Sequence, residues 1–159
     1  MAKRRRYGAV TATLPDWQDA GSAMRWVSTE GAQAVQSSAE GYLALARSEA
    51  PKKAGDLARG IIVGPGFERT SGAKIVADVC MDPDKNDRFV KTSKAGKRYY
   101  YPASQEYGFR TRLSTGRYGS LAQVPGKYYM RTSAVEYSAK HEQNVSAALD
   151  KYLEEEAKQ

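Results

Sequence analysis

The side chains that most often carry out chemistry are few in this 159-residue chain, and they lie far apart. His141 is the only histidine and Cys80 is the only cysteine. A zinc site needs three or four Cys, His or carboxylate ligands, and a general base needs a partner that positions it. We therefore expect a solvent-exposed helix position for His141, a strand or core position for Cys80, and no metal or cofactor.

Two further segments also fall short of a catalytic pattern. Residues 64–67, "GPGF", lack the lysine and hydroxyl of a P-loop and the further glycine of a dinucleotide fingerprint, so we interpret them as a turn. Glu154, Glu155 and Glu156 are consecutive, so they point around a helix instead of facing one another across a cleft. We interpret them as a solvated helix end and predict that the protein is not an enzyme.

The segment 97–102, "KRYYYP", allows two interpretations. Cations beside aromatic rings can follow a phosphate backbone and stack on bases. The same residues alternate as a strand does, with Tyr99 and Tyr101 on one face and Tyr100 on the other. No helix-turn-helix, zinc-finger or RNA-recognition signature accompanies them, and this favours the strand.

Charge is unevenly distributed along the chain, which carries a formal net charge of +7. The basic residues gather in three segments, namely Lys3, Arg4, Arg5 and Arg6; Lys85, Arg88, Lys91, Lys94, Lys97 and Arg98; and Arg110, Arg112 and Arg117. The last turns are acidic instead, with Asp150 and Glu154 to Glu156. Such a molecule can attract a polyanion or the acidic end of another copy of itself.

Length and composition indicate one ordinary domain. The chain is 41% hydrophobic and 27% charged, and a chain of this length buries a single modest core. No apolar run reaches the roughly 20 residues that cross a bilayer, and the basic start is not followed by the apolar block of a signal peptide. We expect a flexible basic arm over residues 1–15, one domain over 16–159, synthesis in the cytoplasm and no membrane partner.

Small and apolar residues recur at helical spacing over residues 16–49, and we predict an amphipathic helix there. The stripe consists of Met24, Val27, Gly31, Ala34, Ser38, Tyr42 and Leu45. Because most of these side chains are small, the helix should lie close against its neighbour. Asp16 or Asp19 can supply the N-cap, and Pro51 ends the helix.

The rest of the chain predicts a small antiparallel sheet and a closing helix. Residues 60–64 and 73–81 read as adjacent antiparallel strands, and a third strand begins at 98 and ends, or becomes an edge, at Pro102. Residues 82–98 read as a mobile loop or an extended hairpin, and 109–126 as a second long loop. The stripe of the closing helix is Val135, Ala139, Glu142, Val145, Leu149 and Tyr152, with Ala148 and Leu153 at its margins. The fold class is α+β, with a long N-terminal helix and a C-terminal helix on a small sheet and two long basic loops.

Three segments, in this order, resemble motifs of the neck and tail-completion proteins of tailed bacteriophages, which join the capsid to the tail. "EAPKKAGDLARGI" matches the family's helix-ending corner at Pro51, Gly55, Leu57 and Ile61. "YPASQEYGF" matches at Tyr101, Ala103, Glu106, Tyr107 and Gly108, and "VPGKYYMRTSAVEY" matches at Pro125, Tyr129, Met130, Arg131 and Ala134. The family often has Thr at the position of Ala54 and a small hydroxyl residue at that of Phe109.

The resemblance implies a non-enzymatic virion protein that forms a sixfold or twelvefold ring around the channel through which genome DNA leaves. Its implied partners are a head-closure or connector protein, a tail terminator or tail tube protein, and the DNA itself. We expect the matched residues to pack within the subunit or against neighbours. The candidate cations for neighbours or for the channel are Arg4, Arg5, Arg6, Lys94, Lys97, Arg98, Arg110 and Arg112. The alternative is a freestanding basic nucleic-acid-binding protein that uses the arm and "KRYYYP".

Overall fold

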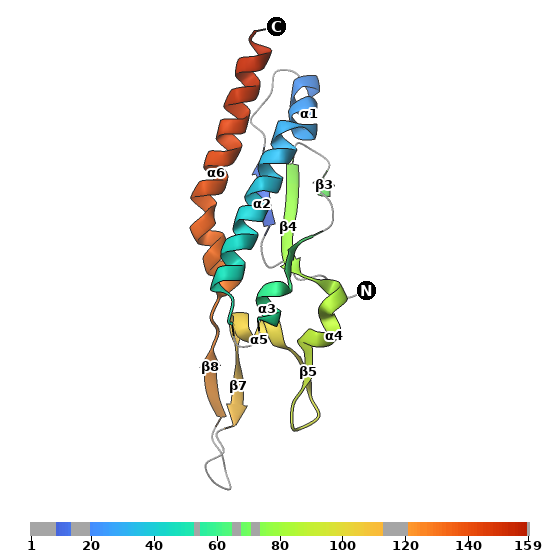
Figure 1. The fold of residues 1–159 in the computed structure, drawn as a ribbon, viewed down its shortest axis with the longest axis vertical. Coiled ribbons are helices and arrows are strands. Elements are labelled where there is room, and N and C mark those ends of the chain that lie inside the picture. Colours follow the sequence, from blue (N-terminus) through green and yellow to red (C-terminus); the bar gives the residue numbers. More distant parts are fainter. Residues whose placement is uncertain are drawn as a thin grey trace.

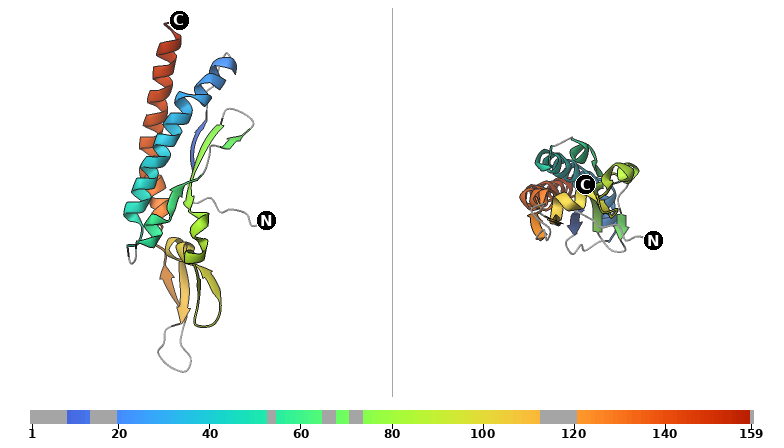
Figure 2. Two further views of the ribbon diagram at one scale, coloured as in Figure 1. Left: turned by 45° about the vertical axis from the view of Figure 1, so that its right-hand side comes forward. Right: turned by 90° about the horizontal axis from the view of Figure 1, so that it is seen from below.

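Two long helices and a four-stranded sheet form the body of the molecule (Figure 1). The computed structural model describes residues 9–13, 20–52, 55–64, 68–70, 74–112 and 121–158. Helix α2 (Glu30–Glu49) lies between the sheet on one side and the antiparallel helix α6 (Tyr129–Glu156) on the other, as both side views show (Figures 1 and 2). The predicted α+β class is confirmed.

The first helical segment is divided in two. Helix α1 (Ala20–Ser28) ends before Thr29, whose backbone leaves the helical region, and α2 begins directly afterwards. The break lets the Trp26 ring pack on α2 at Gly31, where an added Cβ would lie 2.7 Å from the indole. The predicted single helix is therefore interrupted at Thr29, and the predicted caps Asp16 and Asp19 lie outside the described residues.

Small residues bring α2 and α6 close together, as the sequence predicted. A Cβ added to Gly41 would lie 1.9 Å from the Tyr137 hydroxyl oxygen, and Asn144 Nδ2 donates a 3.1 Å hydrogen bond to Ser38 Oγ. The predicted α2 stripe is buried or half-buried from Val27 to Leu45, whereas Met24 is exposed. Helix α2 contacts α6 on one side and the sheet on the other, and its small side chains allow close packing on both sides.

Strand β4 (Lys74–Met81) is the centre of the sheet, and its partners are all antiparallel. Strand β2 (Ile61–Val63) pairs with its second half, with Ile62 opposite Cys80, and β3 (Glu68–Thr70) pairs with its first half on the same edge. The predicted pairing of the two apolar segments is confirmed. Strand β1 (Ala9–Thr13) occupies the other edge, with Thr11 opposite Val76.

Strand β1 corrects the expectation of a flexible arm over residues 1–15. Residues 9–13 pair with β4, and three of the five, Val10, Thr11 and Thr13, are β-branched residues that suit a strand. Residues 1–8, which include the basic cluster Arg4 to Arg6, lie outside the described residues.

The predicted corner follows α2. The helix ends at Glu49, and Pro51 follows after Ala50, where its ring opposes a further helical turn. Gly55 has φ of +70° and starts the short helix α3 (Asp56–Arg59), which places Leu57 in the hydrophobic core. Arg47 holds the corner against the sheet, since its guanidinium donates two hydrogen bonds to the Ile61 carbonyl, of 2.7 and 3.1 Å.

The segment after β4 is a hairpin, one of the two forms that the sequence allowed. A 3-10 turn η1 (Pro83–Lys85) and helix α4 (Asn86–Phe89) lead into β5 (Val90–Thr92), which pairs with β6 (Arg98–Tyr100). Phe89 is buried, and its ring forms an edge-to-face contact with the ring of Tyr100, with 6.2 Å between the ring centroids. The β5–β6 pair forms a separate two-stranded sheet.

Two expectations for the next segment were wrong. The third strand ends at Tyr100, and helix α5 (Tyr101–Tyr107) follows with Pro102 in its first turn, where a missing N–H costs nothing. The supposed second long loop contains a hairpin of β7 (Gly108–Arg112) and β8 (Leu121–Pro125), with Arg110 opposite Gln123. Both hairpins project beyond one end of the body (Figure 1).

Helix α6 is present as predicted, but half of its predicted stripe faces outward. Val135, Ala139 and Glu142 are exposed, Val135 by 69%, whereas Ser133 is buried and Tyr137 half-buried. The C-terminal half of the stripe is correct, because Val145, Leu149 and Tyr152 pack on the core and Leu153 lies outside it. The error arose because α6 buries polar and small side chains that a hydrophobic pattern does not count. No helix in the described ranges is long and apolar enough to cross a bilayer.

Candidate functional site

Glu106 joins the C-terminal end of α5 to the first turn of α6. Its carboxylate is 2% exposed and accepts hydrogen bonds from the backbone N–H groups of Met130 (3.0 Å) and Arg131 (3.1 Å). The first N–H groups of a helix have no partner within the helix, and their positive end favours an anion. Glu106 therefore caps α6 from a different helix, which fixes where α6 starts.

The backbones of the two segments also touch at this junction. A Cβ added to Gly108 would lie 2.2 Å from the Val124 carbonyl oxygen, and one added to Gly126 would lie 2.2 Å from the Glu106 carbonyl oxygen. Gly108 has φ of +79°, so both its backbone angle and the contact require glycine. The structure places this close approach between α5 and β7.

A third helix, α2, also contacts the junction between α5 and α6, through Tyr42. Its hydroxyl donates a 2.9 Å hydrogen bond to the Met130 carbonyl oxygen. Burial raises the pKa of the Tyr42 phenol well above its ordinary value, and the negative charge of Glu106 raises it further. The phenol therefore stays protonated and can donate to α6 over a wide pH range.

The motif residues of the resemblance divide into core and surface positions. Leu57, Tyr129 and Met130 belong to one hydrophobic core, to which the corner and the start of α6 both contribute. Tyr107 and Arg131 are exposed next to this core. Two of the three matched segments thus meet at the α5–α6 junction, and the third contributes to the same core.

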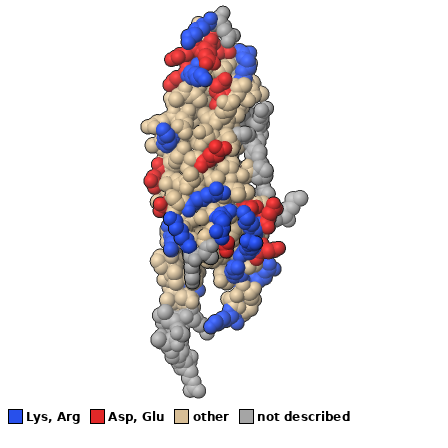
Figure 3. All heavy atoms as spheres, viewed as in Figure 1, with Lys and Arg blue, Asp and Glu red and all other residues tan. Residues whose placement is uncertain are grey.

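The end of the molecule that carries the two hairpins is basic. Lys94, Lys97 and Arg98 are exposed on the β5–β6 hairpin, and Arg110 is exposed on β7; Arg112 lies at the end of β7. No ion pair with a carboxylate of the described residues is formed by Lys94, Lys97, Arg98 or Arg110. Figure 3 shows the blue side chains over the region of α4 and the β5–β6 hairpin.

A pocket of about 460 Å³ lies between the β5–β6 hairpin, α5 and β7. Three aromatic residues line it, one from each of these elements: Tyr99, Tyr101 and Phe109. Lys97 and Arg110 line it as well, and no carboxylate of the described residues does. Tyr99 and Tyr101 were candidates from the sequence, whereas Phe109 fell in the segment predicted to be a loop. The alternation of residues 108–112 was the available signal for a strand at that position.

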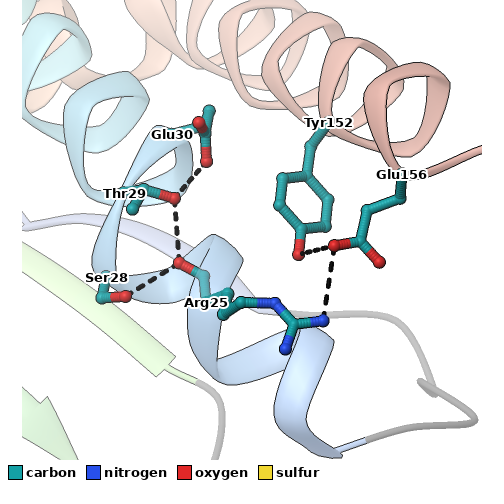
Figure 4. A network of polar contacts seen from close by, with 6 residues as sticks. All are labelled: Arg25, Ser28, Thr29, Glu30, Tyr152 and Glu156. Carbon is teal, nitrogen blue, oxygen red and sulfur yellow. Dashed lines mark hydrogen bonds and ion pairs between the residues drawn. The ribbon is translucent and has the colours of Figure 1, made fainter. Parts of the chain in front are cut away.

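The opposite end of the body holds a polar network between α1 and α6 (Figure 4). Arg25 Nη2 lies 3.4 Å from Glu156 Oε1, and the Tyr152 hydroxyl donates a 2.9 Å hydrogen bond to the same oxygen. The Arg25 carbonyl in turn accepts hydrogen bonds from the hydroxyls of Ser28 and Thr29, at the break between α1 and α2. We expected Glu154 to Glu156 all to be solvated; Glu154 and Glu155 are exposed, but Glu156 is half-buried and bound within its own subunit.

Neither candidate for catalysis lies in a site of the usual kind. His141 is half-buried on α6, in contrast to the expected exposed position, and Cys80 is half-buried in β4. Among the described residues, no three His, Cys, Asp or Glu side chains gather to hold a metal ion. The chain matches no protein-family model, no curated protein and no solved structure.

Proposed function

We propose that the chain is a non-enzymatic structural protein of a tailed-bacteriophage virion, which forms a sixfold or twelvefold ring in the neck around the DNA channel. It joins the capsid connector or head-closure protein to the tail terminator or tail tube. One observation carries the proposal beyond the sequence resemblance: two separate two-stranded hairpins extend from one end of a packed helix–sheet body.

Hairpins of this kind suit contacts between subunits. A two-stranded ribbon is only marginally stable in water, and its outer edges offer unpaired N–H and C=O groups to another chain. The hairpins also expose large apolar side chains, namely Tyr99, Phe109 and Leu121. In a ring, neighbouring subunits would cover these side chains and complete the strand pairing.

The body supplies the rigid part of the proposed ring. Glu106, Tyr42 and the glycine contact fix the hairpin end to α2 and α6, so that force on one hairpin reaches the whole subunit. A ring repeats each charge around its channel, and too strong a positive band would hold the DNA back. We therefore expect few of the cations to face the channel and most to meet acidic surfaces of neighbours or of the platform.

A rotationally averaged image of the phage particle tests the proposal directly, because the ring must lie between the connector and the tail. A companion experiment deletes residues 2–7, which precede β1. We expect almost unchanged thermal stability of the isolated protein and fewer particles with tails, because Arg4 to Arg6 would bridge subunits. Unfolding of the truncated protein, or a normal fraction of tailed particles, would contradict this role.

A second function is favoured by the aromatic and basic pocket. Tyr99, Phe109 and Lys97 offer ring faces and a cation on one surface, as proteins that bind single-stranded nucleic acid do. In that case the isolated monomer would bind DNA with submicromolar, steeply salt-dependent affinity. Titration with short duplex and single-stranded DNA at moderate salt separates this function from the structural one.

A further inference from the structure

The end of the molecule that carries the two hairpins has a large excess of basic over acidic residues. From residue 88 to residue 131 the chain contains Arg88, Lys91, Lys94, Lys97, Arg98, Arg110, Arg112, Arg117, Lys127 and Arg131. The only carboxylate in this stretch is Glu106, which is buried and bound to the N-terminus of α6. Arg88 directly follows Asp87, and the charges of Arg88 and Lys91 act on Asp56. Lys94, Lys97, Arg98 and Arg110 are exposed and form no ion pair with a carboxylate of the described residues, and this favours a ligand with closely spaced negative charges.

The aromatic side chains at this end are arranged in two different ways. Tyr100 turns inward and packs on the buried Phe89. Tyr99 and Phe109 are 44% and 42% exposed, and both line the pocket. Tyr99 belongs to β6 and Phe109 to β7, so the two residues line the pocket from two separate sheets.

The pocket has the size and lining of a site for a planar, phosphate-bearing ligand. Its volume of about 460 Å³ lies within the range of roughly 300–1,000 Å³ that is usual for small-molecule sites. Lys97 and Arg110 lie at the same pocket as the rings, and Ser104 and Gln105 of α5 add hydrogen-bonding groups. The lack of a lining carboxylate disfavours a cation as ligand.

We propose that this pocket binds an unpaired nucleotide of single-stranded nucleic acid, with the base stacked on Tyr99 or Phe109 and the adjoining phosphates near Lys97 and Arg110. Aromatic side chains stack on any base, and cations follow the backbone on either side. A duplex meets this requirement poorly, because its bases are already stacked on one another. The proposal rests on the second function proposed above and names its binding site. It concerns the isolated subunit, in which no neighbouring subunit covers Tyr99 or Phe109.

Fluorescence anisotropy of the full chain tests the site with three labelled probes: a 12-nucleotide oligothymidine, an abasic strand of the same length, and a 12-base-pair duplex. We expect oligothymidine to bind about five- to a hundredfold more tightly than the abasic strand, since each stacked base contributes at this level. The duplex should bind no more tightly than the abasic strand. Equal binding of oligothymidine and abasic strand, or tighter binding of the duplex, would overturn the proposal.

Variants of the pocket assign the effect to these residues. Tyr99→Ala and Phe109→Ala should each remove most of the preference for oligothymidine, and Tyr99→Phe, which keeps the ring, should retain it. Leu121→Ala is the matched control, because Leu121 is an exposed apolar residue of the hairpins that does not line the pocket. Retention of the full preference in both alanine variants would overturn the site.

The charged residues supply an independent measurement. Lys97→Gln should weaken oligothymidine binding more than Lys94→Gln, because Lys97 lines the pocket and Lys94, on the same hairpin, does not. A peptide rich in glutamate serves as competitor in the same assay. If it displaces oligothymidine at equal concentration and its own binding depends equally on Tyr99 and Phe109, the pocket is a protein-docking site and the nucleotide assignment fails.

Discussion

Oε2 of Glu106 accepts a 3.0 Å hydrogen bond from the backbone N–H of Met130, and this bond connects the end of α5 to the start of α6 across 24 residues of chain. Both residues are almost fully buried. Between them the chain runs out along β7 and returns along β8, so the same bond closes the base of that hairpin. Two backbone hydrogen bonds close the same base, from the Lys127 N–H to the Gln105 carbonyl (2.8 Å) and from the Tyr128 N–H to the Glu106 carbonyl (3.0 Å), so the carboxylate is one of several contacts that position the hairpin.

Replacing Glu106 tests this connection. Glu106→Gln keeps one acceptor oxygen but loses the charge at the helix N-terminus, and Glu106→Ala leaves buried N–H groups without an acceptor. We expect the alanine variant to lose about 2 to 4 kcal/mol of unfolding free energy, and the glutamine variant less. Urea unfolding measures both, with Glu136→Gln on the exposed face of α6 as control. A loss in the alanine variant no greater than that of the control would mean that the cap is dispensable.

Tyr42 predicts a loss of stability at alkaline pH. Folding raises the pKa of its phenol, through burial and the charge of Glu106, above the unfolded value of about 10. Its contribution is therefore complete below pH 10 and is lost as the pH rises from there toward the folded pKa. Tyr42→Phe should be less stable at pH 8, because the bond to Met130 is lost, but its stability should fall less between pH 9.5 and 11. Equal slopes for the two proteins in urea unfolding would refute the assignment.

Leu57 tests the corner after α2. Its side chain is buried in the core, so Leu57→Ala should cost about 2 to 5 kcal/mol through lost burial and the cavity left behind. The control Leu121→Ala removes the same atoms from an exposed position and should change stability little. A loss below about 1 kcal/mol for Leu57→Ala in denaturant unfolding would contradict the burial of Leu57 between α2 and the sheet.

Gly108 and Gly96 form a matched pair for separating backbone strain from contact. Both have positive φ, of +79° and +75°, but an added Cβ at Gly96 meets nothing within 4 Å. Gly96→Ala should therefore cost about 1 to 2 kcal/mol, the strain of the left-handed region alone. Gly108→Ala should cost clearly more, because its Cβ would press on the backbone of β8. Similar thermal unfolding midpoints for the two variants would contradict the close contact.

The state of association of the isolated protein bears on the proposed ring. The face between α2 and α6 is already used within the subunit, and on the hairpins only three large apolar side chains of the described residues are exposed, namely Tyr99, Phe109 and Leu121. Obligate oligomers usually bury a large hydrophobic interface. We expect sedimentation at micromolar concentration to give mainly monomer, with the ring forming only on its docking platform. A stable closed ring without partners would contradict this expectation.

The local elements whose signals are short-range could be predicted from neighbouring residues alone. The spacing of small residues in α2, the stop at Pro51, the β-branched residues of β2 and β4 and the long final helix all depend on neighbours within a few positions, and all are present. The corner at Gly55 and the burial of Leu57 were predictable for the same reason. Local propensity and pattern are sufficient where a segment has one strong preference.

The tertiary structure decided which segments meet, and this changed the interpretation of several residues. Residues 9–13 became a strand only because β4 offers an edge, and residues 108–125 became a hairpin because Glu106 and Gly108 bring its ends together. The inward face of α6 is set by Ser38, Gly41 and Tyr42 of α2, a packing that hydrophobic spacing does not encode. The pocket of Tyr99, Tyr101 and Phe109 likewise exists only where two hairpins and a helix converge, since contacts between distant segments depend on the shape of the whole core.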